Sequence, residues 1–488
     1  MPKFDRTHRV VRQGIFSKFQ SYTMYKSIQK YFQYFIAAVK GTEKNFTTGN
    51  INKAIFMLSI PMILEMVMES IFAVVDIYFV GKISVNAVAT VALTESVIMI
   101  IYAIAMGLSM AATAMVARRV GEQKPEQAST AAVQAIILAG GIAVIFALVG
   151  VFFSKEILSL MGGKPDLVEE GYRYTMIMIG GNLSVMLLFV INAIFRGAGD
   201  ASISMRSLIL ANSINIVLDP LFIFGLGQWD GFGLEGAAIA TTTGRGIGVL
   251  FQLYVLFRGS SVIKVAWKNF KVQLEIIISL IKLSLGGIGQ MMIGTLSWLF
   301  LVRISAEFGS DVLAGYAIAF RIIMFTILPS WGLANAAATL VGQNLGAGQP
   351  ERAEKSVWQS AFFNVIFLGI VAMVFFTFAE YFVGLFTPEP GVIEVGAIAL
   401  KYISFGYVFF AYGMVIGQSF NGAGDTKTPT VMNFFCFWLF EVPLAYVLAV
   451  TLDFGPKGIF AAIAIASSLW AVVSIIIFRK GNWKTVKI

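Results

Sequence analysis

Six acidic residues lie inside long apolar stretches of this 488-residue chain. They are Glu65, Glu69, Asp76, Glu95, Asp219 and Glu441. An ionisable group in hydrocarbon costs roughly 2.5–3.5 kcal/mol on insertion scales, so such groups are candidates for ion and proton pathways. Oxygen ligands suit hard cations, and a carboxylate also takes up a proton. The sequence therefore predicts cation or proton binding within a membrane.

Three of these acids share one helical face. At about 100° per residue, Glu65 and Glu69 differ by about 40°, and Asp76 lies about 20° from Glu65. Such a narrow acidic face must point away from lipid. A like charge nearby disfavours ionisation of a carboxyl group. We therefore expect Glu65 and Glu69 to tune the pH response of Asp76.

A second polar pair stands four residues apart. Asn215 and Asp219 lie on the same face of one helix, and their oxygens suit Na⁺ or a shared proton. The alternative interpretation is that the buried acids form structural ion pairs with basic residues in other apolar stretches. These bases are Arg245, Arg303 and Lys282.

Composition indicates the elements that hold these side chains. The chain is 58% hydrophobic and 13% charged, against about a quarter charged in soluble proteins. A membrane-spanning helix needs roughly 20 apolar residues. We predict an all-α, polytopic membrane protein with twelve transmembrane helices. Their ranges are 54–80, 88–117, 131–153, 171–195, 203–226, 236–257, 276–306, 312–341, 356–378, 394–419, 428–452 and 458–478.

An internal repeat divides these helices into two sets. The segment 195–200, FRGAGD, returns at 420–425 as FNGAGD. Its glycines favour tight turns, and its Asp is expected to cap the following helix. Six spans in each copy make the copies parallel in orientation, so a site is expected between them near mid-membrane. The predicted organisation is two pseudo-symmetric six-helix lobes at 51–258 and 276–488, the latter including a basic C-terminal tail, joined by a cytoplasmic linker at 259–275.

Basic residues predict the orientation. Residues 1–50 carry nine Lys or Arg against two acids, and the loops on the same side are basic, whereas the other loops are acidic. The positive-inside rule places both termini in the cytoplasm. We expect the chain to be a multi-pass protein of the cell membrane. The segment 1–50 is expected to rest on anionic lipid.

The cysteine and histidine content narrows the function. Cys436 is the only cysteine and His8 the only histidine, so zinc sites and Ser–His or Cys–His catalysis lack their usual residues. We expect no enzyme activity and no cofactor apart from a coupling ion. We also expect no nucleic-acid partner and a monomer in the lipid bilayer.

The chain resembles the multidrug and toxic compound extrusion (MATE) family. The likeness runs from about residue 51 to 480, and its motifs are specific. They include Ile60-Pro61, Val75-Asp76, the paired FxGAGD segments, the run NIVLDPLFIFG at 215–225 and GAAIAT at 236–241. The resemblance implies an antiporter that exports small, cationic amphiphilic compounds in exchange for H⁺ or Na⁺ by alternating access.

The family pattern also implies a site. In its DinF-like branch, cation binding belongs to the first lobe, and the matching positions are Asp76, Asn215, Asp219 and Thr241. The NorM-like branch adds an acid where this chain has Gln290, so the sequence is closer to the DinF-like branch. The alternative function is a lipid-linked oligosaccharide flippase of the same superfamily architecture.

Overall fold

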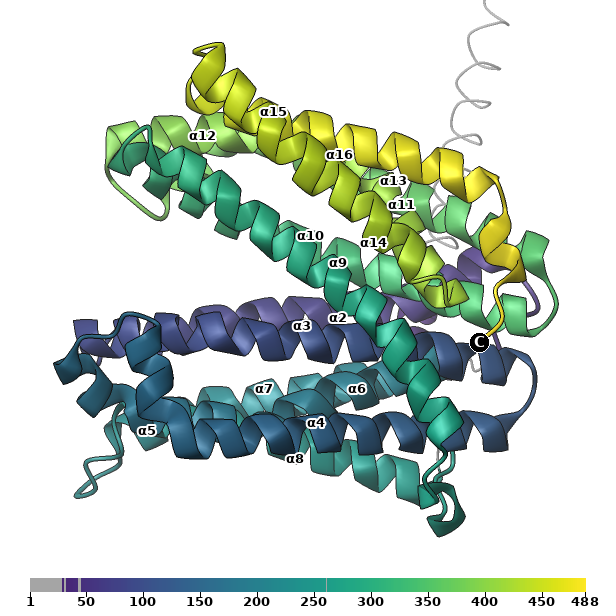
Figure 1. Ribbon diagram of the computed structural model, residues 1–488. Helices are drawn as coiled ribbons and strands as arrows, with labels where there is room; N and C mark the ends of the chain where they lie inside the picture. Colours follow the sequence, from purple (N-terminus) through teal and green to yellow (C-terminus); the bar gives the residue numbers. More distant parts are fainter. Residues whose placement is uncertain (1–28, 30–31, 43–44, 260) are drawn as a thin grey trace, which may run out of the picture.

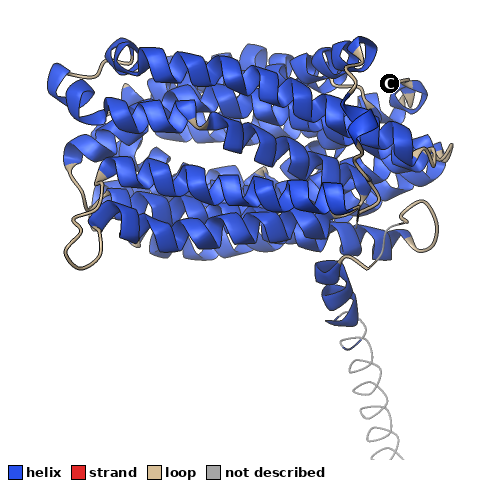
Figure 2. Cartoon of the chain, turned by 90° about the horizontal axis from the view of Figure 1, so that it is seen from below, coloured by secondary structure: helices blue, strands red, loops and turns tan. Residues whose placement is uncertain are grey.

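The computed structural model describes residues 29, 32–42, 45–259 and 261–488. These residues form helices joined by loops (Figure 2). The prediction for 1–50 lies largely outside the described residues, although residues 32–40 form a helix.

The first lobe contains six spans, one of which is broken. Asn50 and Ser84 begin two of its helices by accepting hydrogen bonds from the backbone N–H groups of Lys53 and Ala87, which satisfies donors that the first helical turn leaves free. The helices are α2 (Ile51–Val80), α3 (Val85–Gly121), α4 (Pro125–Leu160), α5 (Pro165–Gly180), α6 (Asn182–Ala198), α7 (Ala201–Phe224) and α8 (Leu234–Arg258).

The second lobe repeats this order after a linker that contains the short helix η1 (Trp267–Phe270). Its fifth span is composite, because two π-helical segments interrupt the α-helix. The helices are α9 (Leu274–Ala306), α10 (Ser310–Gly346), α11 (Pro350–Gly384), α12 (Pro390–Phe405), α13 (Tyr407–Ala423), α14 (Lys427–Asn433), η2 (Phe434–Glu441), α15 (Val442–Tyr446), η3 (Val447–Thr451), α16 (Pro456–Arg479) and η4 (Asn482–Thr485).

The polytopic all-α prediction is confirmed. Ten helices in the described part are long and apolar enough to cross a membrane, and the pair α12–α13, bent by 58°, makes eleven. The twelfth predicted span is α8, which carries the buried Arg245. Many large apolar side chains on the outer surface are exposed, as expected for helices that face lipid. Phe152, Met373 and Ile476 are examples.

The repeat is structural as well as sequential. In each lobe the fourth span breaks at a glycine, Gly181 in one and Gly406 in the other. The third span of each lobe contains one residue outside helical geometry, Phe153 in α4 and Phe378 in α11. When the two FxGAGD segments are aligned, Gly181 matches Gly406 and Phe153 matches Phe378. The two copies therefore share these irregularities.

The FxGAGD turns show where this symmetry ends. Gly199 and Gly424 end α6 and α13 in the left-handed conformation, at φ of 88° and 89°, as expected for a glycine at a helix C-terminus. Asp425 caps the next helix by accepting the N–H of Thr428 at 3.1 Å. The expectation for Asp200 is wrong, because its carboxylate accepts the N–H of Val262 in the linker and makes no cap hydrogen bond to α7.

The two lobes meet at one end of the bundle and diverge at the other (Figure 1). Two glycines allow α3 and α10 to touch at the closed end. A Cβ on Gly121 would lie 2.0 Å from the carbonyl oxygen of Gln343, and a Cβ on Gly346 would lie 2.2 Å from that of Arg118. These contacts are reciprocal, since the repeat aligns Gly121 with Gly346 and Arg118 with Gln343, the two residues whose carbonyl oxygens are approached. The closed end therefore depends on backbone-to-backbone packing.

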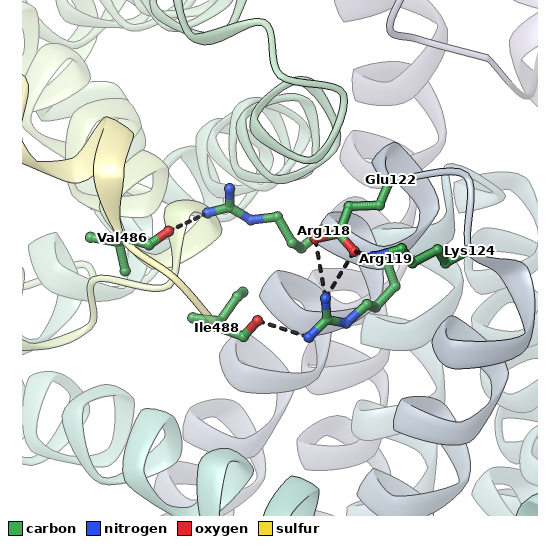
Figure 3. Close-up of polar contacts among 6 residues, drawn as sticks. All are labelled: Arg118, Arg119, Glu122, Lys124, Val486 and Ile488. Atoms are coloured by element: carbon green, nitrogen blue, oxygen red, sulfur yellow. Dashed lines mark hydrogen bonds and ion pairs between the residues drawn. The ribbon is translucent and has the colours of Figure 1, made fainter.

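The end of the chain also crosses between the lobes there. Arg118 donates to the carbonyl of Val486 at 3.0 Å, and Arg119 donates to that of Ile488 at 2.9 Å; Figure 3 shows both contacts. Arg118 also donates to Ala423, at the end of α13. Burial raises the pKa of the neighbouring Glu122, but hydrogen bonds from Arg119 and Lys124 outweigh it and leave that pKa lowered. The first lobe thus presents an ordered basic cluster to the second.

Candidate cation and substrate sites

Helices α7 and α8 bring three of the four predicted cation-site residues together. The side-chain amide of Asn215 donates to Asp219 Oδ1 at 3.0 Å and lies 3.2 Å from Thr241 Oγ1. All three side chains are buried. Asp219 lies one helical turn after Asn215, so α7 itself sets their spacing, whereas Thr241 comes from the packed helix α8.

Asp76 completes the group from α2. Its carboxylate faces the Thr241 hydroxyl and lies within electrostatic range of Arg245, and it also acts on Asp219. Asp76 is four residues from the end of α2 and Asp219 five residues from the end of α7. The cluster, which we call the first-lobe site, therefore lies toward the open end of the bundle.

Two oxygens of the first-lobe site have no hydrogen-bond partner among the described residues. They are Asp219 Oδ2 and Asn215 Oδ1, both fully buried. An unsatisfied buried polar atom costs roughly 1–3 kcal/mol. A cation or a proton would relieve that cost. No group of three or more His, Cys, Asp or Glu side chains in the described part is arranged to hold a metal, so a bound Na⁺ would depend on amide and hydroxyl oxygens as well.

Arg245 is the basic neighbour of this site. The side chain is buried, donates to the Tyr102 hydroxyl at 2.7 Å and lies 3.5 Å from Glu69. Its guanidinium also stacks over the ring of Phe72, 5.1 Å from the centroid. The ion pair with Glu69 is one of the structural pairs that the sequence left open. Glu69 and Asp76, on one face of α2, thus both interact electrostatically with the Arg245 guanidinium.

Glu65 has a different partner. Arg196 of α6 donates to its Oε1 at 2.6 Å, and Glu65 is 1% exposed. The sequence analysis missed this pair, because it placed Arg196 in the turn at 195–200, just beyond the predicted span 171–195. The available signal was the substitution of Arg196 by Asn421 between the two FxGAGD copies, which coincides with the substitution of Glu65 by Gln290.

The second lobe contains the uncharged equivalent of that pair. Gln290 and Asn421 exchange two side-chain hydrogen bonds, both of 3.0 Å. The repeat aligns Gln290 with Glu65 and Asn421 with Arg196. Helices α2 and α6 of the first lobe thus hold a salt bridge where the equivalent helices α9 and α13 of the second lobe hold an amide pair.

A cleft lies between the lobes and is lined by parts of both pairs; its empty space is about 900 Å³ when the part open to solvent is included. Helices α2, α3, α6 and α7 of one lobe line it together with α10 and α13 of the other. Its polar lining includes Glu65, Glu69, Asn192, Arg196, Asn335, Gln418 and Asn421, and its apolar lining includes Met66, Met106, Met110, Phe189 and Trp331. This is the interlobe position at which the repeat predicts a binding site.

The remaining acids lie outside both sites. Glu95 is exposed on α3, within electrostatic range of Asp76 and of Arg321 in the other lobe. Glu441 is buried in the second lobe, where the Ser297 hydroxyl contacts its carboxylate.

The fold and both sites define a two-lobe membrane transporter, and the chain belongs to the MatE family. The family model matches residues 61–221 and 287–447, one match in each lobe. The probable multidrug resistance protein NorM of Thermotoga maritima is 24% identical over 89% of this chain and 93% of its own length. The multidrug export protein MepA of Staphylococcus aureus is 24% identical over 88% and 94%.

Solved structures agree with this membership. The outward-facing conformation of a multidrug resistance MATE family transporter of the MOP superfamily superposes with a TM-score of 0.85. The two sequences are 27% identical, and the alignment covers 90% of this chain and 98% of that one. The predicted two-lobe, twelve-helix architecture is therefore confirmed.

Proposed function

We propose that this protein exports small, amphiphilic organic cations in exchange for H⁺ or Na⁺ by alternating access. The observation that carries the proposal is the pairing of two sites in one molecule. The first-lobe site offers buried, unsatisfied oxygens, and the interlobe cavity offers room for an organic molecule. A coupled transporter needs both, because it must bind a driving ion and a substrate in the same cycle.

The cavity lining supports the substrate class. Methionine side chains adapt to irregular apolar shapes, and Trp331 offers an aromatic face to a cation. Glu65 Oε2 is buried and has no hydrogen-bond partner among the described residues, so it can accept a hydrogen bond from an amine. Arg196 is neutralised by Glu65 and does not offer the surplus positive charge that a pyrophosphate-linked lipid would need. This distinction favours export of cations over the flippase alternative.

Coupling belongs to the first lobe in this proposal. Asp76 takes up H⁺ or Na⁺, while Asn215, Asp219 and Thr241 complete a polar cage around it. Because Gln290 replaces the acid that the NorM-like branch carries in the second lobe, we place the chain nearer the DinF-like branch. We further propose that the protein works as a monomer.

We infer the direction of transport from the proposed orientation. The closed end of the bundle carries the basic loops, including Arg118, Arg119 and Lys124, and we place it in the cytoplasm with both termini. The open end carries the acidic loops and the first-lobe site. An ion arriving from outside therefore meets Asp76 and Asp219 first, as an inward driving gradient requires.

The test is uptake of a fluorescent organic cation by proteoliposomes, with pH and Na⁺ gradients imposed separately. We expect accumulation against the substrate gradient under one of the two ion gradients. Accumulation under neither gradient, by protein that binds the dye, would overturn the antiport mechanism. Control vesicles contain the Asp76→Asn protein at equal density.

A further inference from the structure

Glu441 is a buried acid that the first-lobe mechanism does not use. It is 5% exposed and lies fourteen residues from the start and ten from the end of the composite fifth span of the second lobe, Lys427–Thr451. It takes part in no ion pair among the described residues. A charged carboxylate at such a position, with no base beside it, is strongly disfavoured.

The surroundings of Glu441 are uncharged on every side. Ser297 of α9 contacts the carboxylate at 3.2 Å, and Tyr316 of α10 and Cys436 of its own segment lie within electrostatic range. No Lys, Arg or acidic group on α9, α10 or α16 faces it in the described part of the chain.

One hydroxyl serves two acceptors at this point. Ser297 Oγ lies 3.0 Å from the carbonyl oxygen of Phe437 and 3.2 Å from Glu441 Oε2. A hydroxyl has a single proton to donate. When Glu441 is ionised, Ser297 donates to the carboxylate. When Glu441 carries a proton, its own O–H donates to Ser297 Oγ, and the Ser297 proton turns to the Phe437 carbonyl. Both protonation states are thus satisfied by one rotation.

The backbone at Glu441 is unusual. Residues Phe434–Glu441 form a π-helical segment, with a second at Val447–Thr451. π-Helical turns are rare and often mark functional sites, because they widen the backbone spiral. Phe437 and Glu441 both belong to the first segment, so the proton on Glu441 decides which hydrogen bonds the widened segment makes.

The internal repeat relates the position of Glu441 to the first-lobe site. Ser297 and Glu441 lie on the second-lobe helices that correspond to α2 and α7, the helices of Asp76 and Asp219. Glu441 corresponds to Ile216 of α7, three residues and about one helical turn before Asp219. The second lobe thus holds a carboxylate at the same helix interface, one turn deeper in the bundle.

We propose that Glu441, with Ser297, is a second proton-binding site that lies in the second lobe and titrates during the transport cycle. We assign H⁺ as the ligand, because Ser297 gives the one hydrogen bond to the Glu441 carboxylate among the described residues and no second carboxylate lies beside it. This site rests on the proposed function only for its role in transport. Its occupancy by a proton is a property of the purified protein.

The first measurement is therefore made without transport. Infrared difference spectra between acidic and alkaline samples of the full-length protein record the C=O band of protonated carboxyl groups. We expect Glu441→Gln to remove one component that Asp219→Asn retains. Ser297→Ala should move that component in frequency, because its hydrogen bond is lost. Glu380→Gln is the matched control, a second-lobe acid that is 73% exposed and paired with Lys401; it should leave the component unchanged.

The second measurement counts protons. In proteoliposomes, the reversal potential of substrate flux gives the number of protons moved per substrate. We expect Glu441→Gln to lower that number by about one while transport continues. A Glu441→Gln band identical to wild type over the whole range of pH in which the protein is folded would overturn the site. A lost band component with an unchanged proton count would overturn its role in the cycle.

Discussion

Arg196 donates a hydrogen bond to the Glu65 carboxylate across 2.6 Å, and the pair forms part of the wall of the interlobe cavity. The second lobe holds Gln290 and Asn421 in the same relationship. The chain thus contains its own uncharged template for this contact.

Replacing Glu65 and Arg196 with the Gln and Asn of the second lobe should separate the contribution of charge to stability from that of packing. Glu65→Gln alone leaves a buried guanidinium without its counter-ion, which we expect to destabilise the protein by about 3 kcal/mol. Glu65→Gln with Arg196→Asn should recover most of that loss. Thermal unfolding of the purified single and double variants checks this. Equal destabilisation of both would show that the salt bridge contributes packing that the amide pair does not reproduce.

Asp76→Asn should insert normally and lose coupled transport. The amide keeps the shape of the side chain and can still approach Thr241, but it cannot take up a proton. We expect gradient-driven efflux to fall at least tenfold, with dye binding in detergent retained. Efflux is measured against Glu380→Gln, which changes an exposed acid. Near wild-type efflux by Asp76→Asn would remove this residue from the mechanism.

The two lobes should respond unequally to loss of an acid. Asp219→Asn keeps an oxygen that can accept the hydrogen bond from Asn215, but it removes the carboxylate charge that holds a proton or cation in the first-lobe site, so transport should stop. Glu441→Gln should slow transport by a few-fold, because it removes one of several proton positions. Matched variants of equal expression are compared for initial rate. A complete loss in both would place the essential site in both lobes.

Much of the fold could be predicted from the sequence, because each membrane-spanning helix is marked by its own run of roughly 20 apolar residues. All twelve predicted ranges coincide with a helix or a bent helix pair, and the internal repeat defines the two lobes. The breaks at Gly181 and Gly406 were not predicted, since a glycine inside an apolar run is common in membrane helices and only packing decides whether the helix breaks there. The same limit applies to Phe153 and Phe378.

The candidate sites were predictable in part. Asn215 and Asp219 were placed together because a single helix sets their spacing. Thr241 came from the family resemblance alone, and the structure brings it to 3.2 Å from Asn215. The partners of Glu65 and Glu69 depend on how α2 packs against α6 and α8, which periodicity does not contain. Asp200 was assigned a capping role from its motif, but the linker supplies competing donors.

Glu69 should set the pH response through Arg245. The Arg245 guanidinium lies 3.5 Å from Glu69 and within electrostatic range of Asp76, so Glu69→Gln leaves more of its positive charge to act on Asp76. A carboxyl group beside a less neutralised cation gives up its proton more readily. The optimum of efflux should therefore move toward acid, and further than in Glu65→Gln, because Glu65 is paired with Arg196 instead. The pH profile of efflux checks this. An unchanged optimum in Glu69→Gln would show that Arg245 does not connect the two acids.

The closed end of the bundle should open when a single methyl group is added at Gly121. A Cβ there would lie 2.0 Å from the backbone carbonyl oxygen of Gln343, and a backbone atom cannot rotate away as a side chain can. Gly121→Ala must push α3 and α10 apart, which shifts the population away from the state that is closed at the basic end.

Gln127 of the first lobe and Glu351 of the second are both exposed. Spin labels at these positions report the separation of the lobes by pulsed electron paramagnetic resonance, after Cys436 is replaced by Ala. We expect a longer distance component in Gly121→Ala that is minor in the parent. Gly140→Ala is the control, because α4 leaves open space around that position and alanine is the better helix former. The same distances in Gly121→Ala and Gly140→Ala would mean that α3 and α10 can slide past the added methyl group without separating the lobes. The contacts of Arg118 with Ala423 and Val486 would then be sufficient to hold this end closed.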